Sequence, residues 1–222
     1  TSSKTLHICY CHTPTRYLWD DHLKYLKEST YPWLIKKIIP RLTSYLRLWD
    51  FQAAQRPDQL AAVSDFIAKR ARKYYRRAPC IIYPPVRTKF FIPSAKRNGN
   101  YFLMVGRLLP YKRFDLGIEA FNQLGLPLKI AGSGPEKKRL QKIARANIEF
   151  VGSVSDEDLR NYYQNARALI FPQEEDFGIV AVEAMSCGVP VIAYQSGGAL
   201  ETVREGVSGI FFKEQTIAAL IK

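Results

Sequence analysis

Short apolar runs alternate with segments of helical periodicity from residue 60 to the end of the chain. Each run is four to six residues long, which is the usual length of a strand. The runs are apolar throughout instead of alternating with polar residues, as in a parallel sheet that is covered on both faces. We therefore expect strands at 60–63, 80–83, 101–105, 126–131, 148–151, 168–171, 189–193 and 209–212.

The segments between these runs have the length and the start signals of helices. Ser64 and Ser155 stand where an N-cap belongs, and Pro135 lies at an expected first helical position. Strands and helices that alternate along a chain predict βαβ units, and thus an α/β fold with parallel, doubly wound sheets. The helices expected in this way are 65–75, 113–123, 135–144, 156–164 and 179–187.

Proline marks breaks in the remaining parts of the chain. Residues 30–56 have apolar residues at helical spacing that is interrupted at Pro32 and Pro40, which predicts two helices with a break. Residues 83–100 are rich in proline and polar residues and have no period, so we interpret 86–99 as an interdomain linker. The sequence therefore predicts two domains, which cover 1–85 and 100–222.

The composition is that of a folded protein, because a hydrophobic fraction of 47% in 222 residues is enough for a sizeable core. No apolar run reaches the ~18 to 20 residues of a membrane-spanning helix, and the first ten residues lack the apolar region of a signal peptide. The four cysteines form no CxxC motif, which favours reduced thiols and a cytoplasmic location. Because the chain begins at Thr1 without a methionine, we expect a fragment of a longer protein.

The net charge of +13 comes from the first half of the chain. Residues 1–100 hold 19 Lys and Arg against 6 Asp and Glu, whereas residues 101–222 hold 14 of each. Six positive side chains lie within residues 69–77, and such a run is often only the solvated face of a helix. Tyr74 and Tyr75 could stack on bases, but no nucleic-acid fold signature surrounds them. We therefore expect an anionic membrane surface as the partner of this half, and no nucleic acid.

Candidate binding residues follow the expected strands, at the edge where parallel α/β sheets bind ligands. Arg107 and Lys112 follow one strand, the glycine-rich turns 132–135 and 195–198 follow two others, and the acidic loop 174–176 follows a fourth. Each feature alone is compatible with an ordinary loop. Together, two cations and two turns that expose backbone amides suit a phosphorylated ligand. The glycines do not form GxGxxG, which disfavours a nicotinamide dinucleotide.

Two carboxylates stand out from the rest by their surroundings. Glu175 lies in the acidic loop, and Glu183 lies in the first turns of the helix expected at 179–187. A carboxylate near a helix N-terminus is stabilised as an anion, and it can accept two hydrogen bonds from a vicinal diol such as ribose. The eight-residue spacing alone is weak evidence, because Glu149 and Glu157 share it by accident. The residues thus favour a sugar nucleotide as the ligand.

Several stretches resemble the retaining glycosyltransferases of family 4, in that family's order and spacing. They are GRLLPYK at 106–112, AGSGPE at 131–136 and EEDFGIVAVEAMSCGVPVIAYQSGGALETV at 174–203. Three further stretches are similar to the branch that contains O-antigen mannosyltransferases, namely CHTPTRYLWD at 11–20, LRLWDFQAAQRPD at 46–58 and CIIYPPV at 80–86. The resemblance implies the GT-B fold, with two Rossmann-like domains of parallel sheets. The first, acceptor-side domain would be incomplete here, and the second, donor-binding domain would lack its C-terminal end.

The resemblance also assigns roles to single residues. Arg107 and Lys112 would bind the donor diphosphate, Glu183 would bind the ribose, and Glu175 would hold the transferred sugar with the backbone amides of its loop. His12 matches the family's acceptor-domain histidine beside the sugar, so the catalytic set is His12, Arg107, Lys112 and Glu175. The donor-binding set is Gly106, Arg107, Lys112, Gly134, Glu175, Phe177, Gly178 and Glu183.

No metal is expected as a cofactor, since two cations can do that work and the family has no metal-binding carboxylate motif. His7, Cys9 and Cys11 could form a metal site with His12 only if their side chains converged. On a strand, however, His12 would point opposite to the other three.

The resemblance therefore predicts a hexosyltransferase that moves mannose from GDP-mannose to a glycan or lipid-linked saccharide. Such an enzyme would serve the biosynthesis of lipopolysaccharide or another polysaccharide. It would be cytoplasmic or peripheral on the inner face of the cell membrane. The alternative is a non-enzymatic basic module that binds nucleic acid.

Overall fold

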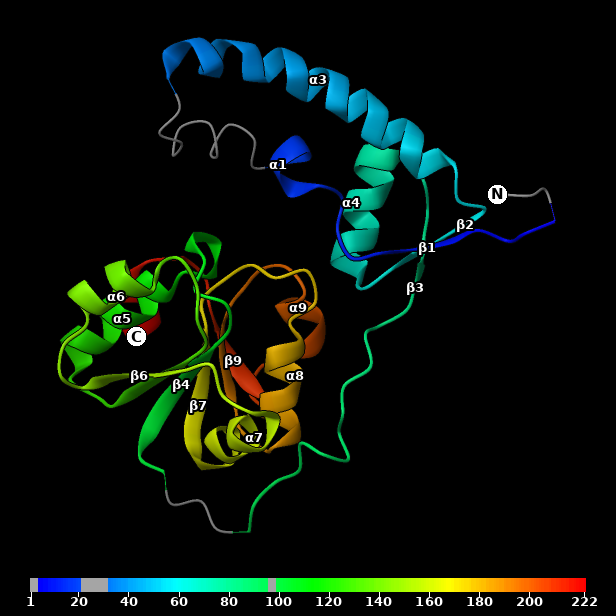
Figure 1. Ribbon diagram of the computed structural model, residues 1–222. Coiled ribbons are helices and arrows are strands. Elements are labelled where there is room, and N and C mark those ends of the chain that lie inside the picture. Colours follow the sequence, from blue (N-terminus) through cyan, green and yellow to red (C-terminus); the bar gives the residue numbers. More distant parts are fainter. Residues whose placement is uncertain (1–3, 21–31, 96–98) are drawn as a thin grey trace. The chain divides into compact units, whose positions relative to one another are not determined.

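The computed structural model describes residues 4–20, 32–95 and 99–222, with the backbone alone at 33–37 (Figure 1). The chain divides into two compact units, Thr1–Tyr83 and Pro84–Lys222. Each unit has a parallel sheet and buried residues of its own.

The first unit is built on a three-stranded parallel sheet in the order β1 (Ile8–Cys11), β2 (Gln59–Ala62) and β3 (Cys80–Ile81). The helices α1 (Arg16–Trp19) and α3 (Trp33–Gln55) lie between β1 and β2 in the chain, and α4 (Asp65–Tyr75) connects β2 to β3. Ser64 caps α4 as predicted, because its hydroxyl accepts a hydrogen bond from the backbone N–H of Ile67 at 3.1 Å. The inner face of α4 is fully buried at Ile67, Ala68 and Ala71.

The prediction of two helices over 30–56 is wrong, because α3 is one curved helix with Pro40 inside it (Figure 1). Pro32 is the N-cap residue of α3, a position at which the missing N–H costs nothing. Pro40 removes a single backbone hydrogen bond from a helix of 23 residues. The C-terminal part of α3 is anchored at Asp50, which accepts hydrogen bonds from Trp19 Nε1 at 2.7 Å and from the Tyr75 hydroxyl at 3.0 Å. This tertiary contact fixes the part of the helix that follows the proline, and a long helix tolerates the loss of one hydrogen bond.

The second unit contains a six-stranded parallel sheet whose spatial order differs from the order along the chain. The strands are β4 (Tyr101–Val105), β5 (Leu128–Ala131), β6 (Ile148–Gly152), β7 (Ala166–Phe171), β8 (Val191–Tyr194) and β9 (Gly209–Phe212). Their spatial order is β6-β5-β4-β7-β8-β9. In this doubly wound order the chain first adds strands on one side of β4 and then returns to the other side, so a topological switch point lies between β4 and β7.

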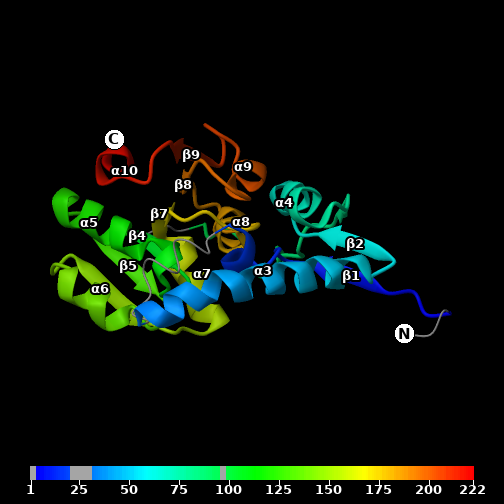
Figure 2. The same cartoon turned by 90° about the horizontal axis from the view of Figure 1, so that it is seen from above.

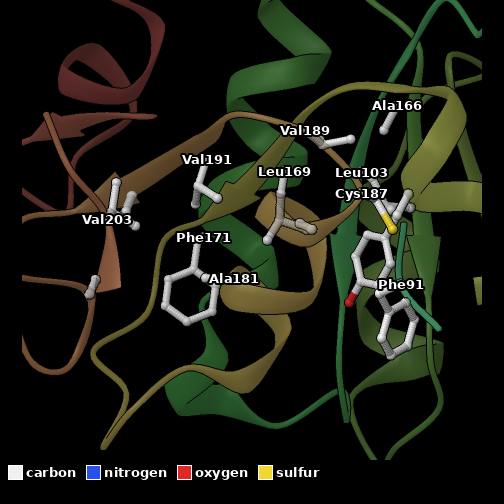
Figure 3. Packing of buried hydrophobic residues seen from close by; sticks show 14 of the residues in the cluster. Phe91, Leu103, Ala166, Leu169, Phe171, Ala181, Cys187, Val189, Val191 and Val203 are labelled. Atoms are coloured by element: carbon white, nitrogen blue, oxygen red, sulfur yellow. The ribbon is translucent and has the colours of Figure 1, made fainter. Parts of the chain in front are cut away.

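Two groups of helices pack against the larger sheet (Figure 2). One buried cluster joins α7 (Asp156–Asn165) and α8 (Ile179–Ser186) to strands that include β7 and β8, and its side chains are drawn in Figure 3. The other joins α5 (Phe114–Leu124), α6 (Lys137–Ile143) and α10 (Ile217–Ile221) to strands that include β4 and β5. The predicted α/β fold with two parallel sheets is therefore confirmed.

Of the two helix start signals predicted for this unit, one is confirmed and the other is wrong. Ser155 caps α7 as predicted, and its hydroxyl accepts a hydrogen bond from the backbone N–H of Asp158 at 3.1 Å. Pro135 is not the first residue of a helix, because α6 begins at Lys137 and Glu136 is its N-cap residue. Pro135 instead belongs to the turn that follows β5.

The described part of the predicted linker contacts the second unit through residues 87–92. Phe91 is 1% exposed and contacts the ring of Tyr163 edge-on, with 5.8 Å between the ring centroids. Arg87 forms an ion pair with Asp156 at 2.7 Å, and the backbone carbonyl of Ile92 accepts a hydrogen bond from Gln164 Nε2 at 2.7 Å. Phe91 is thus part of the core of this unit, and Figure 3 shows it among the buried side chains.

All four cysteines are free thiols. Cys11 on β1 and Cys187 at the end of α8 are buried, whereas Cys80 is exposed. In the described part of the chain, no helix combines the length and the apolar character that crossing a membrane requires.

The packing of Phe91 yields a stability prediction. Phe91→Ala should lower the free energy of unfolding of the second unit by about 3–5 kcal/mol, because it leaves a cavity in the core. Ile92→Ala is the matched control, since Ile92 is 47% exposed, and it should cost less than about 1 kcal/mol. Urea denaturation followed by fluorescence measures both values. Equal losses for the two variants would mean that the segment is a linker after all.

Candidate functional site

A cavity of about 550 Å³ lies at the carboxyl edge of the larger sheet, next to the switch point. Its walls come from residues 105–107 after β4, 131–135 after β5 and 153–154 after β6, with Leu159 of α7 beside them. The cavity therefore lies where doubly wound sheets bind their ligands. Of the predicted site residues, it contains Gly106, Arg107 and Gly134.

Glycine allows two of these loops to touch backbone against backbone. A Cβ at Gly132, which has φ +137°, would overlap the carbonyl oxygen of Gly106, and a Cβ at Gly134 would lie 2.7 Å from the backbone N of Leu108. The close approach is fixed by a hydrogen bond from the N–H of Leu108 to the carbonyl of Ser133 at 2.9 Å. The part of the wall formed by residues 132–134 is therefore mostly backbone, which leaves room for a bulky anion beside Arg107.

The cavity also contains residues that the sequence analysis missed. Ser153 follows β6, and its hydroxyl donates a hydrogen bond to the hydroxyl of Ser133 at 3.0 Å. Val154 and Leu159 line the same wall. The rule that selected Arg107, namely a position directly after a strand of this sheet, would also have selected Ser153.

Lys112 and Glu175 form an ion pair between Nζ and Oε1. Lys112 ends the short 3₁₀ helix Pro110–Lys112 after β4, and Glu175 follows β7, so the pair joins the two strands that flank the switch point. Their side chains are only 14% and 16% exposed. A cation and a hydrogen-bond acceptor thus lie side by side in a mostly buried position.

The acidic loop is held from behind by the glycine turn that follows β8. The Ser196 hydroxyl donates a hydrogen bond to Glu174, so the two neighbouring glutamates have different partners. The N–H of Gly198 donates to the carbonyl of Glu175 at 2.8 Å, and a Cβ at Gly197 would overlap that carbonyl. The turn therefore sets the position of the loop through backbone contacts.

The start of α8 follows directly after this loop. Gly178 is the N-cap residue of α8 in the left-handed conformation, with φ +91°, and Phe177 before it is buried. Glu183 lies on the same helix and is half-buried. Its carboxylate accepts a hydrogen bond from the hydroxyl of Tyr163 at 3.1 Å. Burial raises the pKa of Glu183 above 4.5, whereas the hydrogen bond from Tyr163 and the charge of Arg87 lower it.

His12 belongs to the first unit, directly after β1. Its ring is exposed and meets the ring of Tyr10 edge-on at 5.1 Å. The next residues are held by Arg70, a buried residue of α4, which donates to the Thr13 hydroxyl at 2.8 Å and to the Pro14 carbonyl at 3.3 Å. Arg70 also pairs with Asp20. A buried guanidinium thus fixes the loop that carries His12.

Most positive side chains of the basic cluster 69–77 form hydrogen bonds or ion pairs within the first unit. Besides Arg70, Arg77 donates hydrogen bonds to three backbone carbonyls, and Lys69 and Arg72 pair with Asp65. Lys73 and Arg76 are exposed and form no ion pair with any residue that the structure describes. The six charges of the sequence therefore reduce to a smaller exposed patch.

Comparisons with known proteins match both the fold and the motifs. The family model described as "Glycosyl transferases group 1" matches residues 86–222. An uncharacterized glycosyltransferase of Methanocaldococcus jannaschii is 29% identical over 163 residues, which cover 71% of this chain and 46% of the relative. D-inositol 3-phosphate glycosyltransferase of Mycobacterium leprae is 28% identical over 183 residues, with 71% and 43% covered. The chain thus spans less than half the length of these two curated relatives.

Solved structures resemble the whole chain at lower sequence identity. HepE of Anabaena in complex with UDP-glucose has a TM-score of 0.75 at 20% identity, with 96% of this chain and 60% of that chain covered. Sucrose-phosphate synthase of Thermosynechococcus elongatus has a TM-score of 0.74 at 23% identity, with 96% and 56% covered. These similarities concern the fold.

The ion pair at the switch point yields a second stability prediction. Lys112→Met or Glu175→Gln alone should lower the free energy of unfolding by about 1–3 kcal/mol, because each leaves a mostly buried charge without its counter-charge. The double variant leaves neither charge, so it should lose less than the two single losses added together. Urea denaturation of the four proteins measures this coupling.

A matched cycle on Glu136 and Arg139 serves as the control, because this pair is more exposed, with Arg139 53% and Glu136 21% exposed. Its coupling should be no more than about 0.5 kcal/mol. Additive losses at Lys112 and Glu175 would contradict the prediction.

Proposed function

Because this chain belongs to the family of group 1 glycosyl transferases, we propose that it forms part of a retaining enzyme that moves a hexose from a nucleotide-sugar donor. The observation that carries the proposal is the cavity at the carboxyl ends of β4, β5 and β6, with Arg107 at its wall and glycine loops around it. A nucleoside diphosphate fits this chemistry, because a phosphate can approach a cation closely beside loops that carry no bulky side chain.

In the proposed complex, Arg107 and Lys112 bind the diphosphate of the donor. Glu175 and the backbone amides of Phe177 and Gly178 hold the transferred sugar. Glu183 accepts hydrogen bonds from the ribose hydroxyls. Lys112 then exchanges Glu175 for a phosphate oxygen, which releases the Glu175 carboxylate for hydroxyl groups of the sugar. Both members of the ion pair therefore bind the donor in this proposal.

We propose mannose as the sugar, GDP-mannose as the donor and a glycan or lipid-linked saccharide as the acceptor. This choice rests on the resemblance of 11–20, 46–58 and 80–86 to O-antigen mannosyltransferases. The same resemblance supports a role in the biosynthesis of lipopolysaccharide or another polysaccharide. His12 would lie beside the sugar ring on the acceptor side.

The proposed reaction is a substitution at the front face of the sugar. The bond from the sugar to the diphosphate breaks, and the departing diphosphate takes the proton of the attacking acceptor hydroxyl. Negative charge grows on the diphosphate as it leaves, so groups fixed at that point lower the barrier most. Arg107 and Lys112 supply this stabilisation, and no metal ion is required in the proposal.

We also propose that the first unit contacts the anionic inner face of a membrane. Exposed Lys73 and Arg76 supply positive charge, and α3 has an apolar stripe at Ile38, Leu42, Tyr45 and Trp49, each more than half exposed. Cations near such a surface contribute ~1 kcal/mol each. This contact would bring a cytoplasmic enzyme to a lipid-linked acceptor.

The donor site is tested by the difference between two ligands. Arg107→Ala should weaken the binding of GDP and UDP about tenfold to a hundredfold, because a hydrogen bond to a charged group is lost. It should change the binding of guanosine and uridine little, since they lack the diphosphate. Isothermal titration calorimetry on this chain gives both affinities, and the preferred base shows whether GDP or UDP is the donor nucleotide.

His12→Ala is the matched control, because it lies in the other unit. It should leave nucleotide affinity unchanged while lowering sugar transfer. An unchanged advantage of GDP over guanosine in Arg107→Ala would refute the donor-site proposal. Binding of oligonucleotides in place of nucleotides would favour the nucleic-acid module.

The membrane contact is tested with liposomes. The chain should sediment with vesicles that contain phosphatidylglycerol, less so with vesicles of phosphatidylcholine alone, and less so as salt rises. Lys73→Glu with Arg76→Glu should weaken binding to the anionic vesicles about tenfold or more. Lys138→Glu with Lys142→Glu, at two exposed positions of the second unit, is the control for the same change in net charge and should have a smaller effect. Equal binding to both kinds of vesicle would contradict the proposal.

A further inference from the structure

Tyr163 carries a hydroxyl into the core of the second unit. Its side chain is 0% exposed and packs in the cluster that includes Phe91 and Cys187. A buried hydroxyl costs free energy unless it is hydrogen-bonded, and a phenylalanine would fill nearly the same volume without that cost. The position therefore has a reason to be tyrosine that packing alone does not provide.

The partner of this hydroxyl is Glu183. The hydroxyl donates to Oε2 at 3.1 Å from α7, while Glu183 projects from α8. The other carboxylate oxygen, Oε1, makes no hydrogen bond with the described residues, and Glu183 is half-buried. Leu159, which precedes Tyr163 by one turn of α7, lines the cavity. One oxygen of Glu183 is thus held by the core, and the other is available to a ligand.

We propose that Tyr163 is a positioning residue that fixes the Glu183 carboxylate for the ribose hydroxyls of the donor. The inference rests on the proposed function, because it assumes that Glu183 binds ribose. A glutamate side chain has three rotatable bonds, so a fixed partner reduces the conformational entropy lost on binding. The segment 87–92 supports the pair from behind, since Phe91 packs on the ring of Tyr163.

Because Tyr163 affects the pKa of Glu183, its role can be measured as a change in the pH dependence of nucleotide binding. Burial raises the pKa of Tyr163 well above 10.0, so the phenol remains a donor at all working pH values. Burial also raises the pKa of Glu183, and the hydrogen bond from Tyr163 and the charge of Arg87 oppose this rise, while Asp156 adds to it. Cys187 is the remaining titratable group near Tyr163. Loss of the Tyr163 hydroxyl therefore raises the pKa of Glu183 further.

The test compares Tyr163→Phe with the unchanged chain by calorimetry with GDP and UDP across pH 5–8. The variant should bind the better nucleotide about threefold to tenfold more weakly at neutral pH. Only the ionised carboxylate accepts from both hydroxyls of the diol, so affinity falls as pH falls through the pKa of Glu183. In Tyr163→Phe this fall should begin at a higher pH. The 2′,3′-dideoxy nucleotide should show neither effect.

Tyr162→Phe is the matched control, because it removes a hydroxyl from the same helix without touching Glu183, and it should behave as the unchanged chain. In a Glu183→Gln background, Tyr163→Phe should have no further effect on affinity. A measurement without ligand is the pKa of the Glu183 carboxyl by ¹³C NMR, which should rise in Tyr163→Phe.

The outcomes separate the inference from the proposed function. Binding that depends on Glu183 but is the same in Tyr163→Phe, or an unshifted carboxyl pKa, overturns the inference alone. Absence of nucleotide binding by the unchanged chain, or no effect of Glu183→Gln, overturns the proposed ribose site and the inference with it.

Discussion

The ion pair of Lys112 and Glu175 lies at the topological switch point of the larger sheet, where the order of the strands reverses. The strands β4 and β7 are neighbours in space but are separated along the chain by β5 and β6. No short loop connects them at the carboxyl edge, so a side-chain contact joins their loops there. The acidic loop and the start of α8 follow β7 directly, so this contact lies beside both of them. Each charge of a mostly buried ion pair needs the other as its counter-charge. An anion that approaches Lys112 therefore competes with Glu175.

Many elements of both units could be predicted because their signals are local. Apolar runs without alternation identify strands that are covered on both faces, and Ser64 and Ser155 act as N-caps by contacting residues three positions away. The glycine turns are also local signals, since Gly132 and Gly134 are required by backbone contacts directly after a strand. For the same reason, the sequence alone identifies Gly106, Arg107 and Gly134, which line one cavity in the structure.

The features that could not be predicted depend on contacts between distant residues. The helix α3 continues through Pro40, and its C-terminal part is fixed at Asp50 by Trp19 and Tyr75 from other elements. The burial of Phe91 depends on α7, which lies far along the chain. The pairing of Glu183 with Tyr163 joins two helices whose relative rotation no sequence pattern gives. Arg70 and Arg77 likewise form hydrogen bonds within the first unit, with residues that the sequence pattern does not identify. The number of positive residues in the sequence therefore overestimates the exposed basic patch.

The distribution of the free cysteines has a practical consequence. Cys11 is buried in the first unit and Cys187 in the second, whereas Cys80 is exposed. A thiol that has no access to solvent reacts with a labelling reagent only when its surroundings open. With Cys80 and Cys9 replaced by serine, each unit therefore retains a single native reporter. Mass spectrometry of the labelled peptides can then time the opening of the two units separately in one sample, without any dye or added tag.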